Sequence, residues 1–310
     1  MHYPTDINLL NDAVRKALNE GNRLAKQYEI PGWRQYHHNQ CVFKNKYRHL
    51  QNLRQRRVGN EIIIGETLNY LGLALKHLER AEALCDQVIV KKDLEALKGW
   101  MGYISLFTDQ IFRRCIDGET IPHNEKIFSI FEPHTEWIVK GKAGIKMELG
   151  LRVHVVEDQY QFILYHIVAE KKTDEKLAVD LALGVKIRFP GLKRLSFDKG
   201  YHSKENQKEL SNILDLLILP KKGRLSAVDK ERERQPAFKK GRRQHSAVES
   251  AINGLEHMGL DQCPDHGIDG FKRYVSLSVV ARNIHRIGVI LLQKELENEQ
   301  RKRGSYKKAA

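Results

Sequence analysis

The pattern of apolar residues changes once along the chain, near residue 121, and this change limits the folds that the sequence can adopt. Before it, apolar residues recur three and four positions apart, as they do in amphipathic helices. After it, short apolar runs alternate with helical stretches. We therefore predict an α/β protein with a helical region over residues 1–120, a mixed-sheet core over residues 121–292 and a charged tail over residues 293–310.

Four stretches of the first region are predicted to be helices, and the second of them is strongly basic. They cover roughly residues 6–30, 38–57, 61–90 and 92–114, with a break at Pro31-Gly32. The basic cluster at residues 54–57 suits the solvated face of a bundle and suits contact with DNA phosphates equally well. The sequence leaves both interpretations open.

Strands and helices alternate in the second region. Residues 149–156 and 162–168 are predicted to form a hairpin, and further short strands are predicted at residues 192–197 and 216–219. Helical patterns lie between these strands, and a last apolar helix covers residues 274–292. This order fits a mixed sheet with helices on its faces.

Two acidic residues are placed where such a fold can bring them together. Asp198 follows the strand at residues 192–197, and Gly200 can let the backbone turn there. Glu249 lies beside the apolar stripe of Val248, Ile252 and Leu255 on a predicted helix. An Asp at the end of a strand and a Glu on a helix can share hard cations, and phosphoryl-transfer enzymes use such ions.

Several short words of sequence around these acids resemble a known family. They occur in the same order as in that family, and the similarity covers nearly the whole chain. The chain resembles the DDE transposases of bacterial insertion sequences, above all the group called ISNCY. The words are Asp198-Lys199-Gly200-Tyr201-His202-Ser203, Leu219-Pro220-Lys221-Lys222-Gly223, residues 242–253 and residues 263–274.

The resemblance implies a fold, a reaction and a set of partners. The core is expected to be ribonuclease-H-like, with the N-terminal helices as an insertion between its first and second strands. Asp198 and Glu249 are expected to bind Mg²⁺ or Mn²⁺ for DNA cleavage and strand transfer. The expected partners are double-stranded DNA, as transposon ends and target, and a further copy of the chain.

A third acidic ligand is not evident where the resemblance places it, on the central first strand of the fold. In this group that strand leads almost directly into a word like His2-Tyr3-Pro4-Thr5-Asp6, which here opens the chain. We therefore expect the Asp-bearing strand to lie upstream of Met1 and the chain to be truncated and inactive alone. Glu132, Glu136 and the turn acids Glu157-Asp158 are the alternatives within the chain.

The charge of the chain favours a polyanionic partner. Its formal net charge is +14 with a pI near 9.5, although a merely basic protein would share these values. Residues 221–243 are the most polar segment and are predicted to form a mobile loop that touches DNA. His245 stands where related transposases often carry an Arg. The candidates for DNA contact are Lys199, Lys221, Lys222, Lys239, Lys240, Arg242, Arg243 and His245.

The remaining features concern compartment and alternative functions. Four separated cysteines without a CxxC pair suggest reduced thiols, and no apolar run was expected to reach membrane-spanning length, so a cytoplasmic protein without a membrane is predicted. Two other functions fit the same residues. One is a non-catalytic DNA-binding regulator derived from a transposase, and the other is a ribonuclease-H-like nuclease that only hydrolyses.

Overall fold

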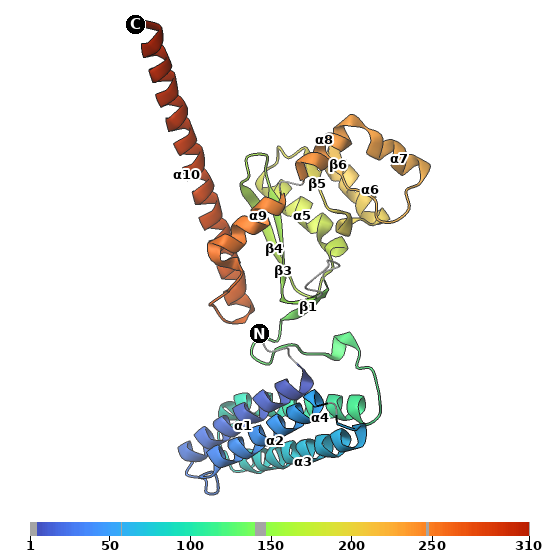
Figure 1. Cartoon of the computed structure of the whole chain (residues 1–310), viewed down its shortest axis with the longest axis vertical. Coiled ribbons are helices and arrows are strands. Elements are labelled where there is room, and N and C mark those ends of the chain that lie inside the picture. The colour runs from blue at the N-terminus through green and yellow to red at the C-terminus, as the bar shows by residue number, and fades with distance from the viewer. Residues whose placement is uncertain (1–4, 57, 140–146, 246–247, 310) are drawn as a thin grey trace. The chain divides into compact units, whose positions relative to one another are not determined.

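The computed structural model describes residues 5–56, 58–139, 147–245 and 248–309, except for the side chains of residues 147, 248–251 and 302–309 (Figure 1). The chain divides into two compact units, Met1–Trp137 and Ile138–Ala310. Each unit has its own hydrophobic core.

The first unit is built from four long helices, as the apolar periodicity predicted. Helix α1 begins after Thr5, whose hydroxyl accepts a hydrogen bond from the Asn8 amide at 3.3 Å. The bundle centre holds Phe43, which stacks on Tyr70 with the ring centroids 4.7 Å apart. The helices are α1 (Asp6–Gln27), α2 (Tyr36–Gln55), α3 (Asn60–Cys85) and α4 (Glu95–Cys115), with short η1 (Lys91–Leu94) and η2 (His123–Glu125).

A histidine side chain, His77, is buried in the core of the first unit. His77 of α3 packs edge-on against Phe43, and its Nε2 atom has no hydrogen-bond partner among the described residues. Burial, assisted by the charge of Arg80, lowers the pKa of His77 from 6.5 to about 4. The unfolded chain therefore binds a proton at this residue in a pH range where the folded chain does not.

We expect His77 to cost stability as the pH falls below 6.5. Because the pKa of His77 is lower in the folded state than in the unfolded state, the free energy of unfolding is unaffected above about pH 6.5 and falls as the pH drops below it. The loss reaches about 2 kcal/mol by pH 5. Denaturant unfolding at pH 7 and pH 5 measures this difference. His77→Leu should remove it, whereas His37→Leu, at an exposed site on α2, should not. An equal pH dependence in the His77→Leu variant would contradict the assignment.

The second unit has the mixed α/β composition predicted, and its hairpin lies where it was expected. Strand β3 pairs antiparallel with β4, and β5 pairs in parallel with β6 after a crossover through α6. Strand β1 pairs with β2. The elements are β1 (Glu136–Val139), β2 (Met147–Gly150), β3 (Arg152–Glu157), β4 (Ile163–Ala169), α5 (Asp174–Arg188), β5 (Arg194–Ser196), η3 (Lys199–Tyr201), α6 (Lys204–Ile213) and β6 (Leu216–Ile218).

The strands do not form the single mixed sheet that was predicted. In the described part of the chain they make three two-stranded sheets. Helix α5 supports two of them at once, because Val156 of β3, Leu181 of α5 and Leu195 of β5 belong to one buried cluster. The sheet is interrupted between β3 and β5, where no described strand connects the two pairs.

The segment at residues 221–243, predicted as a loop, contains most of two short helices. Helix α7 (Ala227–Arg234) begins with a capping box between Ser226 and Asp229, and helix α8 (Pro236–His245) is held by the buried side chain of Phe238. The prediction was wrong because it weighed the polar composition and overlooked these local contacts. A cap and an apolar side chain packed on the core both stabilise such short polar helices.

The C-terminal region is more helical than predicted. After α9 (Val248–Leu255) and η4 (Glu256–Leu260), α10 extends over Gly267–Ala309 and takes in the segment expected to be a frayed tail. By length and composition, residues Gly267–Arg301 of this helix could cross a membrane, whereas no apolar run of that length was expected from the sequence. A single helix of this kind is weak evidence for a membrane span. Helix α10 is also docked on protein, since Asn283 exchanges two hydrogen bonds with the Ile163 backbone and Arg286 donates to the Tyr160 carbonyl at 2.9 Å.

Candidate functional site

Asp198 lies at the carboxyl end of β5, as predicted. Its Oδ1 atom accepts a hydrogen bond from the Lys199 amide at 2.7 Å, and the residue is exposed. Gly200 is not at a positive φ angle, so the turn itself does not require glycine. Glycine instead leaves room for a neighbouring side chain, because a Cβ atom there would lie 2.7 Å from a carboxylate oxygen of Asp174.

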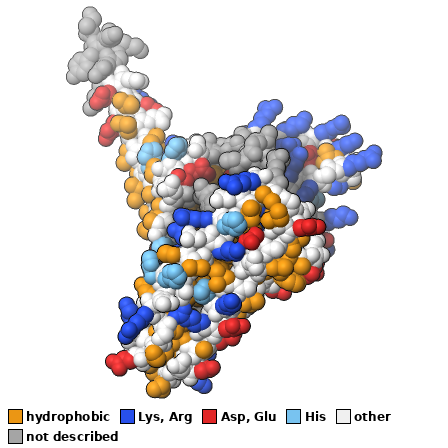
Figure 2. Space-filling model, turned by 60° about the horizontal axis from the view of Figure 1, so that its bottom comes forward, with side chains coloured by type: hydrophobic (Ala, Val, Ile, Leu, Met, Phe, Trp, Pro, Cys, Tyr) orange, Lys and Arg blue, Asp and Glu red, His pale blue; other side chains and the backbone are white. Residues whose placement is uncertain are grey.

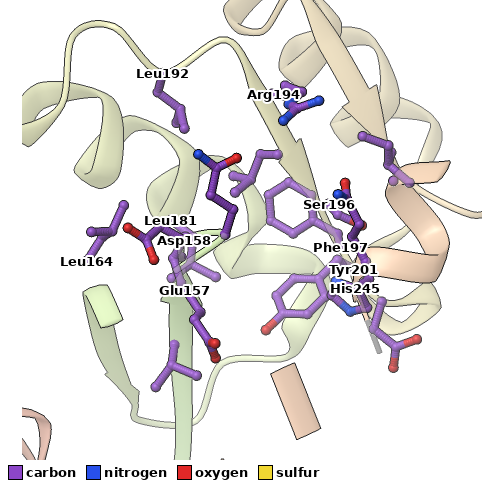
Figure 3. Close-up of a pocket in the computed structure, with 18 of the residues that line it drawn as sticks. Glu157, Asp158, Leu164, Leu181, Leu192, Arg194, Ser196, Phe197, Tyr201 and His245 are labelled. Carbon is purple, nitrogen blue, oxygen red and sulfur yellow. The ribbon is translucent and has the colours of Figure 1, made fainter. Parts of the chain in front are cut away.

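Asp198 borders a cavity of about 980 Å³ that separates β3 from β5. One wall is formed by residues 153–157 of β3 and the opposite wall by residues 191–198, which include β5. Leu181 of α5 lines one face. Figure 3 shows Glu157 on one side of this space and Ser196, Phe197 and Tyr201 on the other.

Tyr201 and His154 meet across one end of the cavity. The Tyr201 hydroxyl forms a short hydrogen bond with His154 Nδ1, and the Tyr201 ring packs on Phe197 at 5.3 Å between centroids. Burial raises the pKa of Tyr201, and the charges of Asp174 and Asp198 add to the effect. Burial also lowers the pKa of His154, so both side chains are held neutral near pH 7.

Three side chains along the walls carry buried polar atoms without a hydrogen-bond partner among the described residues. They are His154 Nε2, Glu157 Oε2 and Ser196 Oγ. Burial raises the pKa of Glu157, and the positive charge of Arg282 opposes that shift. Sequence reasoning took Glu157 for a turn residue and did not single out Ser196 or His154. Only the meeting of β3 with β5 reveals them, so no local signal was available.

Helix α8 brings basic residues to the rim of the same cavity. It packs closely on β6, because a Cβ atom at Gly241 would lie 2.6 Å from the Ile218 side chain. Lys240 and His245 line the cavity, and Lys239, Lys240, Arg242 and Arg243 are exposed. Figure 2 shows Lys and Arg side chains gathered at the upper right of that view. This end of the unit is therefore suited to a polyanion.

Several of the predicted DNA-contacting cations are already paired within the protein. Lys221 forms a short ion pair with Asp229, Lys222 lies 3.5 Å from Glu175, and Arg242 lies 3.9 Å from Glu233. Lys221 keeps only 22% of its side chain exposed. No ion pair is recorded within the described residues for Lys199, Lys239 or Lys240, which leaves these three the better placed for a partner.

The pairing of Asp198 with Glu249 concerns a side chain outside the described residues. Position 249 lies on α9, which follows α8 along the chain. Among the residues whose side chains are described, no group of three His, Cys, Asp or Glu residues converges to hold a metal ion. The exposed carboxylate of Asp198 is the type of ligand that Mg²⁺ prefers, but a complete site needs further acids.

A comparison with known protein families gives these features a context. The model of the family described as a transposase DDE domain matches residues 113–284, which is more than half of the chain. The chain belongs to this family. The match contains Asp198, Glu249 and the basic helix α8. No curated protein and no solved structure matches the chain.

Membership of the transposase DDE domain family confirms the resemblance noted in the sequence and supports a function in DNA transposition. Such transposases act on DNA, and the family usually uses a divalent metal.

Proposed function

We propose that this protein is the catalytic core of an insertion-sequence transposase that cleaves DNA and joins a 3′ end to a target with the help of Mg²⁺ or Mn²⁺. The observation that carries the proposal is the position of Asp198. This carboxylate lies just after β5, inside the matched family region, and borders a cavity whose rim carries Lys240 and His245. A carboxylate that could bind a metal cation and basic side chains that could contact DNA phosphates thus lie at one edge of the unit.

Asp198, Glu249 and a further Asp are the proposed metal ligands. When bound, the ions would activate water or a 3′-hydroxyl and stabilise the leaving oxygen. The protein itself would position and neutralise the DNA. Lys199, Lys239 and Lys240 are proposed to bind phosphates directly. Lys221, Lys222, Arg242, Arg243 and His245 are proposed to act beside them, with those held in internal ion pairs contributing less.

A ribonuclease-H-like arrangement is part of the proposal. The antiparallel pair β3–β4 and the parallel pair β5–β6, joined through α5, fit the two flanks of such a mixed sheet. The helices of the first unit would then be an insertion between the first and second strands. The third acid would lie on the central strand of this sheet, and cleavage would require that strand.

The environment follows from the same proposal. The expected partners are double-stranded DNA and a second copy of the chain, in the cytoplasm. The net charge of +14 suits double-stranded DNA, which is a polyanion.

A strand-transfer assay tests the reaction class. The chain, extended upstream through an Asp-bearing strand, is incubated with Mg²⁺ and a transposon-end duplex that presents a 3′-hydroxyl, together with a supercoiled target plasmid. We expect joined products. Hydrolysis without joining would favour the ribonuclease-H-like nuclease, and binding without either reaction would favour the non-catalytic regulator.

A further inference from the structure

We propose that an exposed apolar stripe of α10 is the interface at which two copies of this chain pair, with their α10 helices antiparallel. We call this stripe the seam, and it consists of Leu277, Val280, Ile284, Ile287 and Leu291. The proposal goes beyond the proposed function, which expects a second copy without naming a surface for it. It rests on α10 and does not depend on the transposase reaction.

The seam residues are spaced as in a coiled coil. The steps between them are three, four, three and four positions, which is the alternation of a and d positions in a heptad repeat. A helix that packs on a globular core carries a wider apolar stripe, whereas a narrow stripe of a and d positions fits a second helix. Ala281 and Gly288 flank the seam seven positions apart, and their small size lets another helix approach closely. The partner that fits the seam is therefore a helix.

A different side of α10 is docked on the rest of the second unit. Val275, Val279 and Arg282 are buried, and Asn283 exchanges two hydrogen bonds with the Ile163 backbone. The five seam residues, in contrast, are each between 48% and 64% exposed. Docking of α10 therefore leaves the seam accessible to a partner.

The C-terminal part of α10 lacks the packing that usually stabilises a helix. Every side chain described from Leu291 to Arg301 is exposed, and Figure 1 shows this end of α10 extending away from the other elements of the second unit. Most of the stability of a helix in a protein comes from packing of its apolar side, and isolated helices are marginal in water. A second helix on the seam would supply this packing.

The charges along α10 favour an antiparallel pair of identical helices. Lys272 and Arg273 lie before the seam, and Glu295, Glu297 and Glu299 lie after it. In an antiparallel pair the basic end of each copy meets the acidic end of the other, and twofold symmetry makes the contact twice. In a parallel pair the glutamates of the two copies would face each other. Charges of this kind select the partner and its direction in helix pairs.

The spacing of the seam also gives a register. When Ile284 of one copy lies opposite Ile287 of the other, each a position faces a d position, and Lys272 lies opposite Glu299. The overlap from residue 272 to residue 299 is about 40 Å long. Lys272 already forms an ion pair with Glu170, but both side chains are 45% exposed, so the pair contributes little and can be exchanged.

A membrane suits α10 less well than a second copy does. Asn283 and Arg286 donate hydrogen bonds to the backbone at Ile163 and Tyr160, and a membrane span would have to break these contacts. The three glutamates at residues 295–299 lie inside the segment Gly267–Arg301, and charged side chains are costly in hydrocarbon. The apolar length of the helix is therefore assigned to the seam.

Sedimentation of the 310-residue chain, without DNA or metal, tests the assembly. We expect a dimer, and Leu291→Glu should weaken it at least about tenfold, because each copy then places a charge in the seam. Leu292→Glu is the matched control. Leu292 is the next residue and is similarly exposed, at 58% against 54%, but it lies outside the a and d positions. Its replacement should leave the dimer affinity within about threefold, and thermal unfolding checks that both variants are folded.

Carbodiimide cross-linking in a mixture of isotope-labelled and unlabelled chains tests the direction. Within one copy, Lys272 and Glu299 are separated by about 40 Å of helix, too far for an amide bond to form between them. We expect peptides that join Lys272 of one copy to Glu295, Glu297 or Glu299 of the other. Such a peptide, with one labelled half, can form only when the two helices are antiparallel.

Several outcomes would overturn the proposal. A chain that stays monomeric at its highest soluble concentration would exclude the seam as a dimer interface. Equal weakening by Leu291→Glu and Leu292→Glu would indicate unspecific apolar association, and a dimer without the expected cross-links would exclude the antiparallel pair. Flotation of the chain with phosphatidylcholine vesicles would assign α10 to a membrane instead. The strand-transfer assay tests the transposase proposal separately from each of these results.

Discussion

Replacing Asp198 with Asn should abolish Mg²⁺-dependent cleavage by a chain that has been extended upstream through an Asp-bearing strand. The amide keeps the shape of the side chain but loses the negative charge that would hold the cation, so the cleavage rate should fall by at least about 10³-fold. Cleavage of a labelled transposon-end duplex measures the rate. Glu249→Gln should have an effect of the same order.

Asp215→Asn is a matched control for this prediction. Asp215 is an exposed acid just before β6, and it does not line the cavity. Its replacement should leave the cleavage rate within about twofold of the extended parent, a change of less than about 0.5 kcal/mol. The 310-residue chain alone should not cleave. Robust cleavage by that chain would remove the argument for a missing strand, and Glu132 or Glu136 would become the leading candidates for the third ligand.

The elements that the sequence predicted best are those fixed by local pattern. The four helices of the first unit follow from apolar residues repeating at helical spacing, and the β3–β4 hairpin follows from two apolar runs around the turn that begins at Asp158. Asp198 could be placed at the end of a strand for the same reason. In each case the information lies within a short window of the chain.

The features that sequence reasoning missed depend on contacts between distant segments. Ser196 and His154 become notable only because β3 and β5 face each other across a cavity. Gly200 was assigned to a turn, but its small size serves the approach of Asp174, which lies 26 positions earlier in the chain. The helices α7 and α8 were missed for a different reason. The capping box of Ser226 and Asp229 is visible in the sequence, and the polar composition around it was given more weight.

The interrupted sheet connects the fold to the proposed chemistry. The strand expected to carry the third acid would also be the strand that fills the gap beside Asp198. A chain without it would therefore lack a ligand and expose two strand edges at the same time.

DNA binding by the 310-residue chain should weaken steeply as salt rises. If the four cations on α8 each contact a phosphate, the affinity should fall about a hundredfold between 50 and 200 mM salt, because each contact releases about 0.9 counterions. Lys239→Ala with Lys240→Ala should then flatten the slope of log affinity against log salt by about two units. Both lysines are exposed on α8, and no ion pair is recorded for either within the described residues. Fluorescence anisotropy with a duplex of arbitrary sequence measures the slope.

The ion pair of Arg242 makes this prediction more specific. Because Arg242 already lies 3.9 Å from Glu233, its replacement by Ala should flatten the slope by less than the full unit expected for a free cation. The double change Lys204→Ala with Lys208→Ala, which removes the same charge from α6, is the control. It should change the slope by less than the double lysine change on α8. If the α6 pair flattens the slope as much as the α8 pair, net charge alone governs binding and α8 is not the DNA-binding helix. If binding does not respond to salt at all, the phosphate contacts proposed for α8 are wrong.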